Sequence, residues 1–197
     1  AAALLGPFWR MHSPKTENGG SIVRSETPGP VLFANCLVKD QHGNPLSGVE
    51  IDVWQSSPVG LYENQDDNQT DMNLRGKFIS DAQGRFSFRS VTPAGYPIPL
   101  HGPVGDMIRA QDRRHFRPAH IHFSLFGNAF ATRLVTQMYF PGDPLLLLDP
   151  IYNSVTDEKA RQRMISHFDI QLTQPEQALG FRFDIVLRGR NATPREK

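Results

Sequence analysis

The sequence predicts an all-β protein, an antiparallel sandwich of two sheets with long loops and one short helix. Three observations lead to this fold class. Apolar and polar side chains alternate through most segments after residue 30, turn-forming Gly, Asn and Asp residues separate these segments, and only one segment has helical spacing. Such alternation is typical of strands that bury one face against a second sheet.

The chain begins with a segment that is rich in Pro and Gly, which predicts an extended arm over residues 1–30. We expect one globular domain at 31–190 and a short tail at 191–197. A chain of 197 residues can bury one sizeable core, so its length does not require a second domain.

Seven short segments have the two-residue period of strands: 31–38, 49–54, 76–80, 85–88, 120–126, 134–140 and 181–187. Turn residues at 40–45 and 81–84 predict that the strands on either side of each turn are antiparallel neighbours.

One helix is predicted behind an acidic start at 156–158, because apolar residues follow it at helical spacing: Ala160, Met164, Ile165 and Phe168. Two stretches, 56–74 and 92–119, have no clear period and are expected to be loops. Long loops on a compact sandwich are more often functional than accidental.

The composition excludes several classes of partner. A net charge of +1, from 21 basic and 20 acidic residues that are mixed along the chain, gives no long-range field to attract nucleic acid or an anionic membrane. No apolar run approaches the length of a membrane span. The single cysteine, Cys36, fits a reducing compartment, so we expect a cytoplasmic protein with a small-molecule partner.

Two histidines one residue apart, His120 and His122, lie in the predicted strand 120–126. Because side chains alternate along a strand, both rings are expected on one face, while Ile121 and Phe123 point into the opposite layer. Two imidazoles on one face can hold a metal, but a strand histidine also serves packing or a backbone hydrogen bond. The pair alone leaves both interpretations open.

Two tyrosines favour the metal interpretation. Tyr62 and Tyr96 lie in the two long loops, whereas Tyr139 and Tyr152 are explained by strand packing and by a loop aromatic position. A phenol has an ordinary pKa of about 10 and binds tightly only as phenolate, which a highly charged cation can enforce. Zinc more commonly recruits cysteine, a third histidine or a carboxylate. Ferric iron, Fe(3+), is therefore the favoured metal.

Five segments occur in a characteristic order along nearly the whole chain: Leu-Leu-Gly-Pro-Phe at 4–8, Val-Trp-Gln at 53–55 with Gly-Leu-Tyr at 60–62, Pro-Ala-Gly-Tyr-Pro at 93–97, Arg-Pro-Ala-His-Ile-His at 117–122 and Thr-Gln at 136–137. In these segments the sequence resembles the intradiol ring-cleaving dioxygenases. The resemblance implies Fe(3+) held by four ligands: Tyr62, Tyr96, His120 and His122. It also implies that a catechol-type ring is cleaved with O2 between its two hydroxyl-bearing carbons, which gives a muconate-type diacid.

The resemblance also implies roles for three side chains. Tyr96 is the ligand expected to leave the metal when substrate binds. Arg117 is expected to stabilise negative charge on the activated ring, because its guanidinium stays protonated, and Gln137 to assist by hydrogen bonding. Alternatively, Arg117 is an exposed charge paired with Asp112, and Gln137 is an ordinary outward-facing strand residue.

The sequence resembles two subgroups of the family that act on different substrates. Residues 72–76, 96–99 and 102–105 resemble the catechol and hydroxyquinol enzymes, whereas residues 131–137 and 181–189 resemble the β chain of protocatechuate 3,4-dioxygenase. The expected pocket walls are mostly apolar, which favours catechol or hydroxyquinol over a carboxylate-bearing ring: Leu4, Pro7, Ile98 and Pro99. A carboxylate would instead need Arg10, Arg24 or a neighbouring subunit.

We expect a homo-oligomer, or a hetero-oligomer with a homologous chain. Two other classes stay open at this point. A cupin-like ferrous or zinc enzyme would add a carboxylate and a third histidine to the pair. A transthyretin-like binding sandwich would share the architecture without any use for paired tyrosines and histidines.

Overall fold

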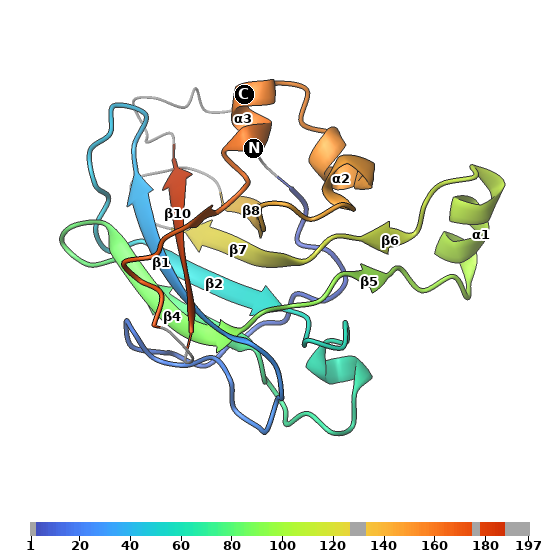
Figure 1. Cartoon of the computed structure of the whole chain (residues 1–197), viewed down its shortest axis with the longest axis horizontal. Coiled ribbons are helices and arrows are strands. Elements are labelled where there is room, and N and C mark those ends of the chain that lie inside the picture. Colours follow the sequence, from blue (N-terminus) through green and yellow to red (C-terminus); the bar gives the residue numbers. More distant parts are fainter. Residues whose placement is uncertain (1–2, 127–132, 175–177, 188–197) are drawn as a thin grey trace.

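The structure is a computed structural model and describes residues 3–126, 133–174 and 178–187. Its main strands are β1 (Val31–Lys39), β2 (Glu50–Gln55), β3 (Arg75–Ile79), β4 (Arg85–Val91), β7 (His120–Phe126), β8 (Leu134–Tyr139), β9 (His167–Phe168) and β10 (Leu179–Val186). They form two four-stranded sheets, in the orders β4-β1-β10-β9 and β3-β2-β7-β8 (Figure 1). The predicted two-sheet β-sandwich is confirmed, and all seven predicted strands are present.

The core lies between the two sheets and takes alternate residues from each strand. On β1, Leu32, Ala34, Cys36 and Val38 are buried, and from the other sheet Phe123 packs among aromatic rings of the first. Burial of apolar area, at about 25 cal/mol per Å², is the main force that holds two such faces together.

The pairing predicted across the two turns is wrong. β1 pairs antiparallel with β4 and parallel with β10, whereas β2 pairs antiparallel with β3 and β7. The turns at 40–45 and 81–84 therefore carry the chain from one sheet to the other. The strands on both sides of each turn lie in opposite layers and bury residues in the same core.

The structure contains three α-helices in the described residues rather than the single one predicted: α1 (Pro103–Ala110), α2 (Pro150–Asn153) and α3 (Glu158–Gln162). Two 3-10 helices accompany them, η1 (Glu63–Gln65) and η2 (Leu146–Leu148). α3 begins after its cap Asp157, as predicted, but ends at Gln162. The following backbone pairs with sheet edges, Ile165 with Tyr139 and β9 with β10, so the predicted continuation to Phe168 is wrong.

The second long loop contains a small antiparallel ribbon, β5 (Tyr96–Pro97) and β6 (Phe116–Arg117), in which Tyr96 pairs with Arg117. α1 lies at the far end of this ribbon, away from both sheets (Figure 1). The ribbon therefore brings a predicted ligand and the predicted catalytic arginine side by side.

The N-terminal arm runs along the sandwich and forms isolated bridges, Lys15 with Lys77 on β3 and Ser21 with Arg89 on β4. The arm, domain and tail boundaries remain a prediction. The tail at 191–197, the domain end at 188–190 and residues 131–132 of the resembling segments lie outside the described residues. None of the helices in the described ranges is long and apolar enough to span a membrane.

We expect Phe123→Ala to lower the free energy of unfolding by about 3–5 kcal/mol, because this fully buried ring packs against Phe86, Phe88 and Phe183. Urea denaturation followed by circular dichroism measures the change. The matched control is Phe126→Ala on the same strand, whose side chain is 52% exposed. Equal losses for both variants would contradict the position of the core.

Candidate metal centre

The register of β7 between its two neighbours brings the predicted side chains together. His122 lies opposite Trp54 on β2 and opposite Gln137 on β8, while His120 lies opposite Tyr139. Opposed residues of antiparallel strands share one face of the sheet. These five side chains therefore occupy the face of the β3-β2-β7-β8 sheet that points away from the core. The predicted division of β7 between two faces is confirmed, since Ile121 and Phe123 belong to the core.

The four predicted ligands lie close together. The Nε2 atoms of His120 and His122 are 3.1 Å apart, and the Tyr62 hydroxyl is 3.1 Å from His122 Nε2. The ring of Tyr96 lies 5.5 Å from that of His120 and 5.6 Å from that of Tyr62, and all four side chains are buried. Two imidazole rings and two phenol rings thus form one buried cluster.

Both histidines are neutral in this environment. Burial lowers the pKa of His120 to about 3, and the charge of Arg117 adds to the effect. Burial also lowers the pKa of His122 well below its ordinary range, with further contributions from His120 and Arg117. A neutral imidazole offers the free nitrogen lone pair that a metal ligand needs.

Different contacts orient the two imidazole rings. His120 Nδ1 lies 2.7 Å from the Pro118 carbonyl oxygen, to which it donates when the proton is on Nδ1, so Nε2 is then free. Nδ1 of His122 is buried without a partner among the described residues. Its ring is instead stacked on Trp54, at 4.8 Å between centroids and 2° between planes. Trp54 therefore fixes the plane of a predicted ligand ring.

Tyr62 is completely buried, and burial raises the pKa of its hydroxyl well above the ordinary value, with Tyr96 acting in the same direction. The positive charges of Arg117 and Arg75 oppose this rise. The phenol is therefore protonated unless a strongly charged cation displaces the proton. Phe8 of the arm stacks on the Tyr62 ring at 4.1 Å and fixes its plane.

A buried ion-pair network anchors the residue next to Tyr62. The Glu63 carboxylate accepts hydrogen bonds from Arg75 Nε at 2.8 Å and from Arg10 Nη1 at 2.6 Å. Arg75 also donates to the Phe8 carbonyl oxygen, so the network joins the arm, η1 and β3. The sequence analysis did not find Glu63 or Arg75, because their pairing depends on contacts between distant segments.

The network also bears on the two arginines that were considered for a substrate carboxylate. Arg10 is bound to Glu63 and Asp71, and Arg24 donates to Thr16 and to the Arg75 carbonyl oxygen. Both guanidiniums are thus engaged by the protein itself.

Arg117 lies beside the predicted ligand His120 and is only 4% exposed. Its Nε and Nη2 atoms donate to the two carboxylate oxygens of Asp149, and Nη2 also donates to Gln137 Oε1 at 2.7 Å. Nη1 lies 3.1 Å from His120 Nε2. The alternative of an exposed Arg117 paired with Asp112 is wrong, and Gln137 lies on the face away from the core but is buried.

Burial acts to lower the pKa of Arg117, but hydrogen bonds and the charge of Asp149 outweigh it, and the net shift is upward.

Sequence reasoning missed Asp149 and gave Tyr139 only a packing role. The Tyr139 hydroxyl lies 2.7 Å from Asp149 Oδ2 and 2.8 Å from Gln137 Oε1. The Asp-Pro pair at 149–150 signals a helix start, but it cannot show that the capping carboxylate also faces an arginine.

The residues expected to line the substrate pocket differ in how far they are exposed to solvent. Leu4 is 88% exposed, Pro7 and Pro99 are exposed, and Ile98 is half-buried. From the arm, Leu5 and Phe8 instead pack against the cluster that contains Trp54, Tyr62 and Tyr96. The pocket assignment of Leu4, Pro7, Ile98 and Pro99 remains a prediction.

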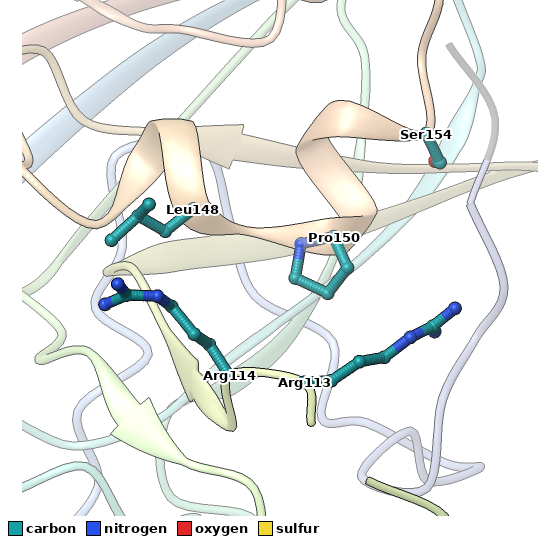
Figure 2. Close-up of a pocket in the computed structure, with 5 residues that line it drawn as sticks. All are labelled: Arg113, Arg114, Leu148, Pro150 and Ser154. Carbon is teal, nitrogen blue, oxygen red and sulfur yellow. The ribbon is translucent and has the colours of Figure 1, made fainter. Parts of the chain in front are cut away.

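A separate surface pocket of about 450 Å³ is lined by Arg113, Arg114, Leu148, Pro150 and Ser154. Figure 2 shows the two arginine side chains beside Pro150 and diverging from one another. None of the four predicted ligands lines it.

Within residues 3–126, 133–174 and 178–187, no group of three or more His, Cys, Asp or Glu side chains could hold a metal ion. The ligand set of a cupin-like enzyme is therefore not found in these ranges, and His167, which was expected in a helix, lies exposed on β9. The two tyrosines are the candidate ligands that lie closest to His120 and His122 in these ranges.

Comparison with known proteins gives consistent matches. The dioxygenase family model matches residues 4–189. The chain is 42% identical over 182 residues to the protocatechuate 3,4-dioxygenase beta chain of Burkholderia cepacia, covering 90% of this chain and 72% of that protein. It is 40% identical over 171 residues to catechol 1,2-dioxygenase of Candida albicans, covering 86% of this chain but only 54% of that enzyme.

Among solved structures, hydroxyquinol 1,2-dioxygenase from Pseudomonas putida DLL-E4 matches with a TM-score of 0.81 and 30% identity, over 96% of this chain and 66% of that one. The chain thus spans between about half and three quarters of the length of these relatives.

We expect Glu63→Ala to lower the free energy of unfolding by about 3–5 kcal/mol, because it leaves the buried guanidinium of Arg75 without its counter-charge. Urea denaturation tests this expectation. Asp71→Ala removes the exposed partner of Arg10 and serves as control, with little change expected. A small effect of Glu63→Ala would contradict an anchoring role of the network.

Proposed function

Because the chain belongs to the intradiol ring-cleaving dioxygenase family, we propose that it cleaves a catechol-type ring with O2 between the two hydroxyl-bearing carbons. The product would be a muconate-type diacid that contains both oxygen atoms. The observation that carries this proposal is the convergence of two neutral imidazoles and two buried phenols beside a buried arginine.

We propose that Tyr62, Tyr96, His120 and His122 bind Fe(3+). The donor set fits this ion, because phenolate is a hard anionic ligand and because the raised pKa of Tyr62 requires a strongly charged cation for deprotonation. Bound ferric iron would draw electron density from a catecholate, so that the ring can react with O2.

The two tyrosines differ in how firmly they are held. Phe8 stacks on Tyr62, and the neighbouring Glu63 is fixed by Arg75 and Arg10. Tyr96 lies on a strand of only two residues. This difference supports Tyr96 as the ligand that gives way to the substrate, and its phenolate oxygen would then accept a proton from a substrate hydroxyl.

Arg117 would stabilise the negative charge that develops on the ring. Its Nη1 edge faces the ligand nitrogen of His120, whereas its other nitrogens are bound to Asp149 and Gln137. A guanidinium held in advance stabilises developing charge without the cost of reorienting solvent. Gln137 would act by holding this guanidinium through its side-chain oxygen.

The favoured substrates are catechol and hydroxyquinol. The apolar side chains of Leu5 and Phe8 pack at the centre, and the protein itself engages Arg10 and Arg24. The alternative, a protocatechuate 3,4-dioxygenase β-type subunit, is supported by the 42% identity to such a chain, in which case a partner chain would supply the carboxylate contact. A homo-oligomer is expected with the favoured substrates, and a cytoplasmic location remains a prediction from Cys36.

We expect O2 uptake with at least one of catechol, hydroxyquinol and protocatechuate, and a ring-opened diacid as product. Mass spectrometry after reaction under ¹⁸O2 would find both heavy atoms in that diacid. Cleavage beside the hydroxyl-bearing carbons would contradict the proposal, and a lack of turnover with a colourless protein would favour the transthyretin-like binding sandwich.

We expect the purified protein to be red-brown from tyrosinate-to-iron charge transfer, and Tyr62→Phe or His122→Ala to lose iron and colour. Arg117→Ala should keep both but lower kcat by about 100- to 1,000-fold. Metal analysis and visible absorption measure these effects, with Tyr152→Phe as a control outside the centre. Iron retention by His122→Ala would argue against the ligand assignment.

A further inference from the structure

We propose that Asp149 is a positioning residue for ring cleavage, because its buried carboxylate holds the guanidinium of Arg117 so that Nη1 is presented to the metal centre. This inference rests on the proposed function, since it concerns the same reaction. It adds a residue that the sequence motifs do not contain.

The contacts fix the plane of the guanidinium. Arg117 Nε is 3.2 Å from Asp149 Oδ1, and Nη2 is 2.9 Å from Oδ2, so one edge of the guanidinium meets both carboxylate oxygens. Such two-point pairing sets orientation as well as distance. Nη2 also contacts Gln137 and the Tyr139 hydroxyl. Nη1 is the nitrogen that remains directed at His120.

The carboxylate is itself held firmly. Asp149 has no exposed surface and caps α2, accepting from the backbone N–H groups of Ile151 and Tyr152. The Tyr139 hydroxyl adds a contact at 2.7 Å to Oδ2. A carboxylate with these partners cannot follow the arginine if the arginine moves, so it acts as a fixed reference point.

The charges around Arg117 explain why its counter-ion, the Asp149 carboxylate, must be held in a fixed position. Asp149 is the carboxylate that pairs with the buried guanidinium of Arg117, at 2.9 Å between Nη2 and Oδ2. In the proposed reaction, tyrosinates and a catecholate bring several negative charges within reach of Arg117. Without Asp149, the guanidinium would turn toward these anions and leave the orientation in which Nη1 serves the ring.

The test is Asp149→Asn, which preserves the shape and one of the two capping oxygens but removes the charge. We expect iron content and the charge-transfer colour to be retained, KM to change little and kcat to fall by about 10- to 100-fold. Asp157→Asn is the matched control, because the Asp157 carboxylate also caps a helix, accepts from the Ala160 N–H, and forms no ion pair with an arginine in the described residues. It should leave kcat unchanged.

A double-variant cycle separates positioning from general destabilisation. If Asp149 acts through Arg117, Asp149→Asn combined with Arg117→Ala should be as active as Arg117→Ala alone, within about twofold. Losses that multiply, or an unchanged kcat in Asp149→Asn, would overturn the proposal. Should Asp149→Asn fail to fold, Tyr139→Phe tests the same assembly by removing one hydroxyl, with a smaller fall in kcat and the same non-additivity expected.

A measurement without turnover distinguishes this inference from the proposed function. In the full chain without iron, the NMR signal of the Arg117 Nε–H should exchange slowly with solvent, and it should shift and exchange rapidly in Asp149→Asn. Fast exchange in the unaltered protein would overturn the positioning role. Ring cleavage that is absent with all three substrates, together with a protected signal, would overturn only the proposed function.

Discussion

The register of β7 between β2 and β8 is the constraint on which the rest of the structure depends. This register directs alternate residues of β7 into the core and places His120 and His122 on the opposite face. The same register places Trp54, Gln137 and Tyr139 around the two imidazoles. A shift by one residue would exchange the two sets and destroy core and centre together.

Two buried ion pairs flank the neutral histidines His120 and His122, and in each pair the opposite charges balance one another. Glu63 and Arg75 lie on the side of Tyr62, and Arg117 and Asp149 lie on the side of His120. Each pair is closed by further hydrogen bonds, which is the condition under which buried charges are tolerated. The pairs fix the positions of side chains around the centre while adding no net charge to it.

Local sequence was sufficient for the strands, for the opposed faces of β7 and for the choice of Tyr62, Tyr96, His120 and His122, which the fold brings into one buried cluster, because strand periodicity and short motifs act over a few positions. Their role as ligands remains a proposal. Local sequence failed where distant segments meet. The partner of Arg117 was expected nearby at Asp112 but is Asp149, and the segment after Gln162 left its helical pattern because sheet edges offered hydrogen bonds. Glu63 and Arg75 were missed for the same reason, since only the folded arm and loops bring them together.

The parallel pairing of β1 with β10 joins strands from opposite ends of the described chain. During synthesis, β1 therefore emerges long before β10, whereas β2, β3, β7 and β8 can pair earlier. Contacts between such distant residues slow folding, because a large loop must close before they form. The edge of β1 that pairs with β10 would invite association with other chains in that interval, and the arrival of β10 ends this risk.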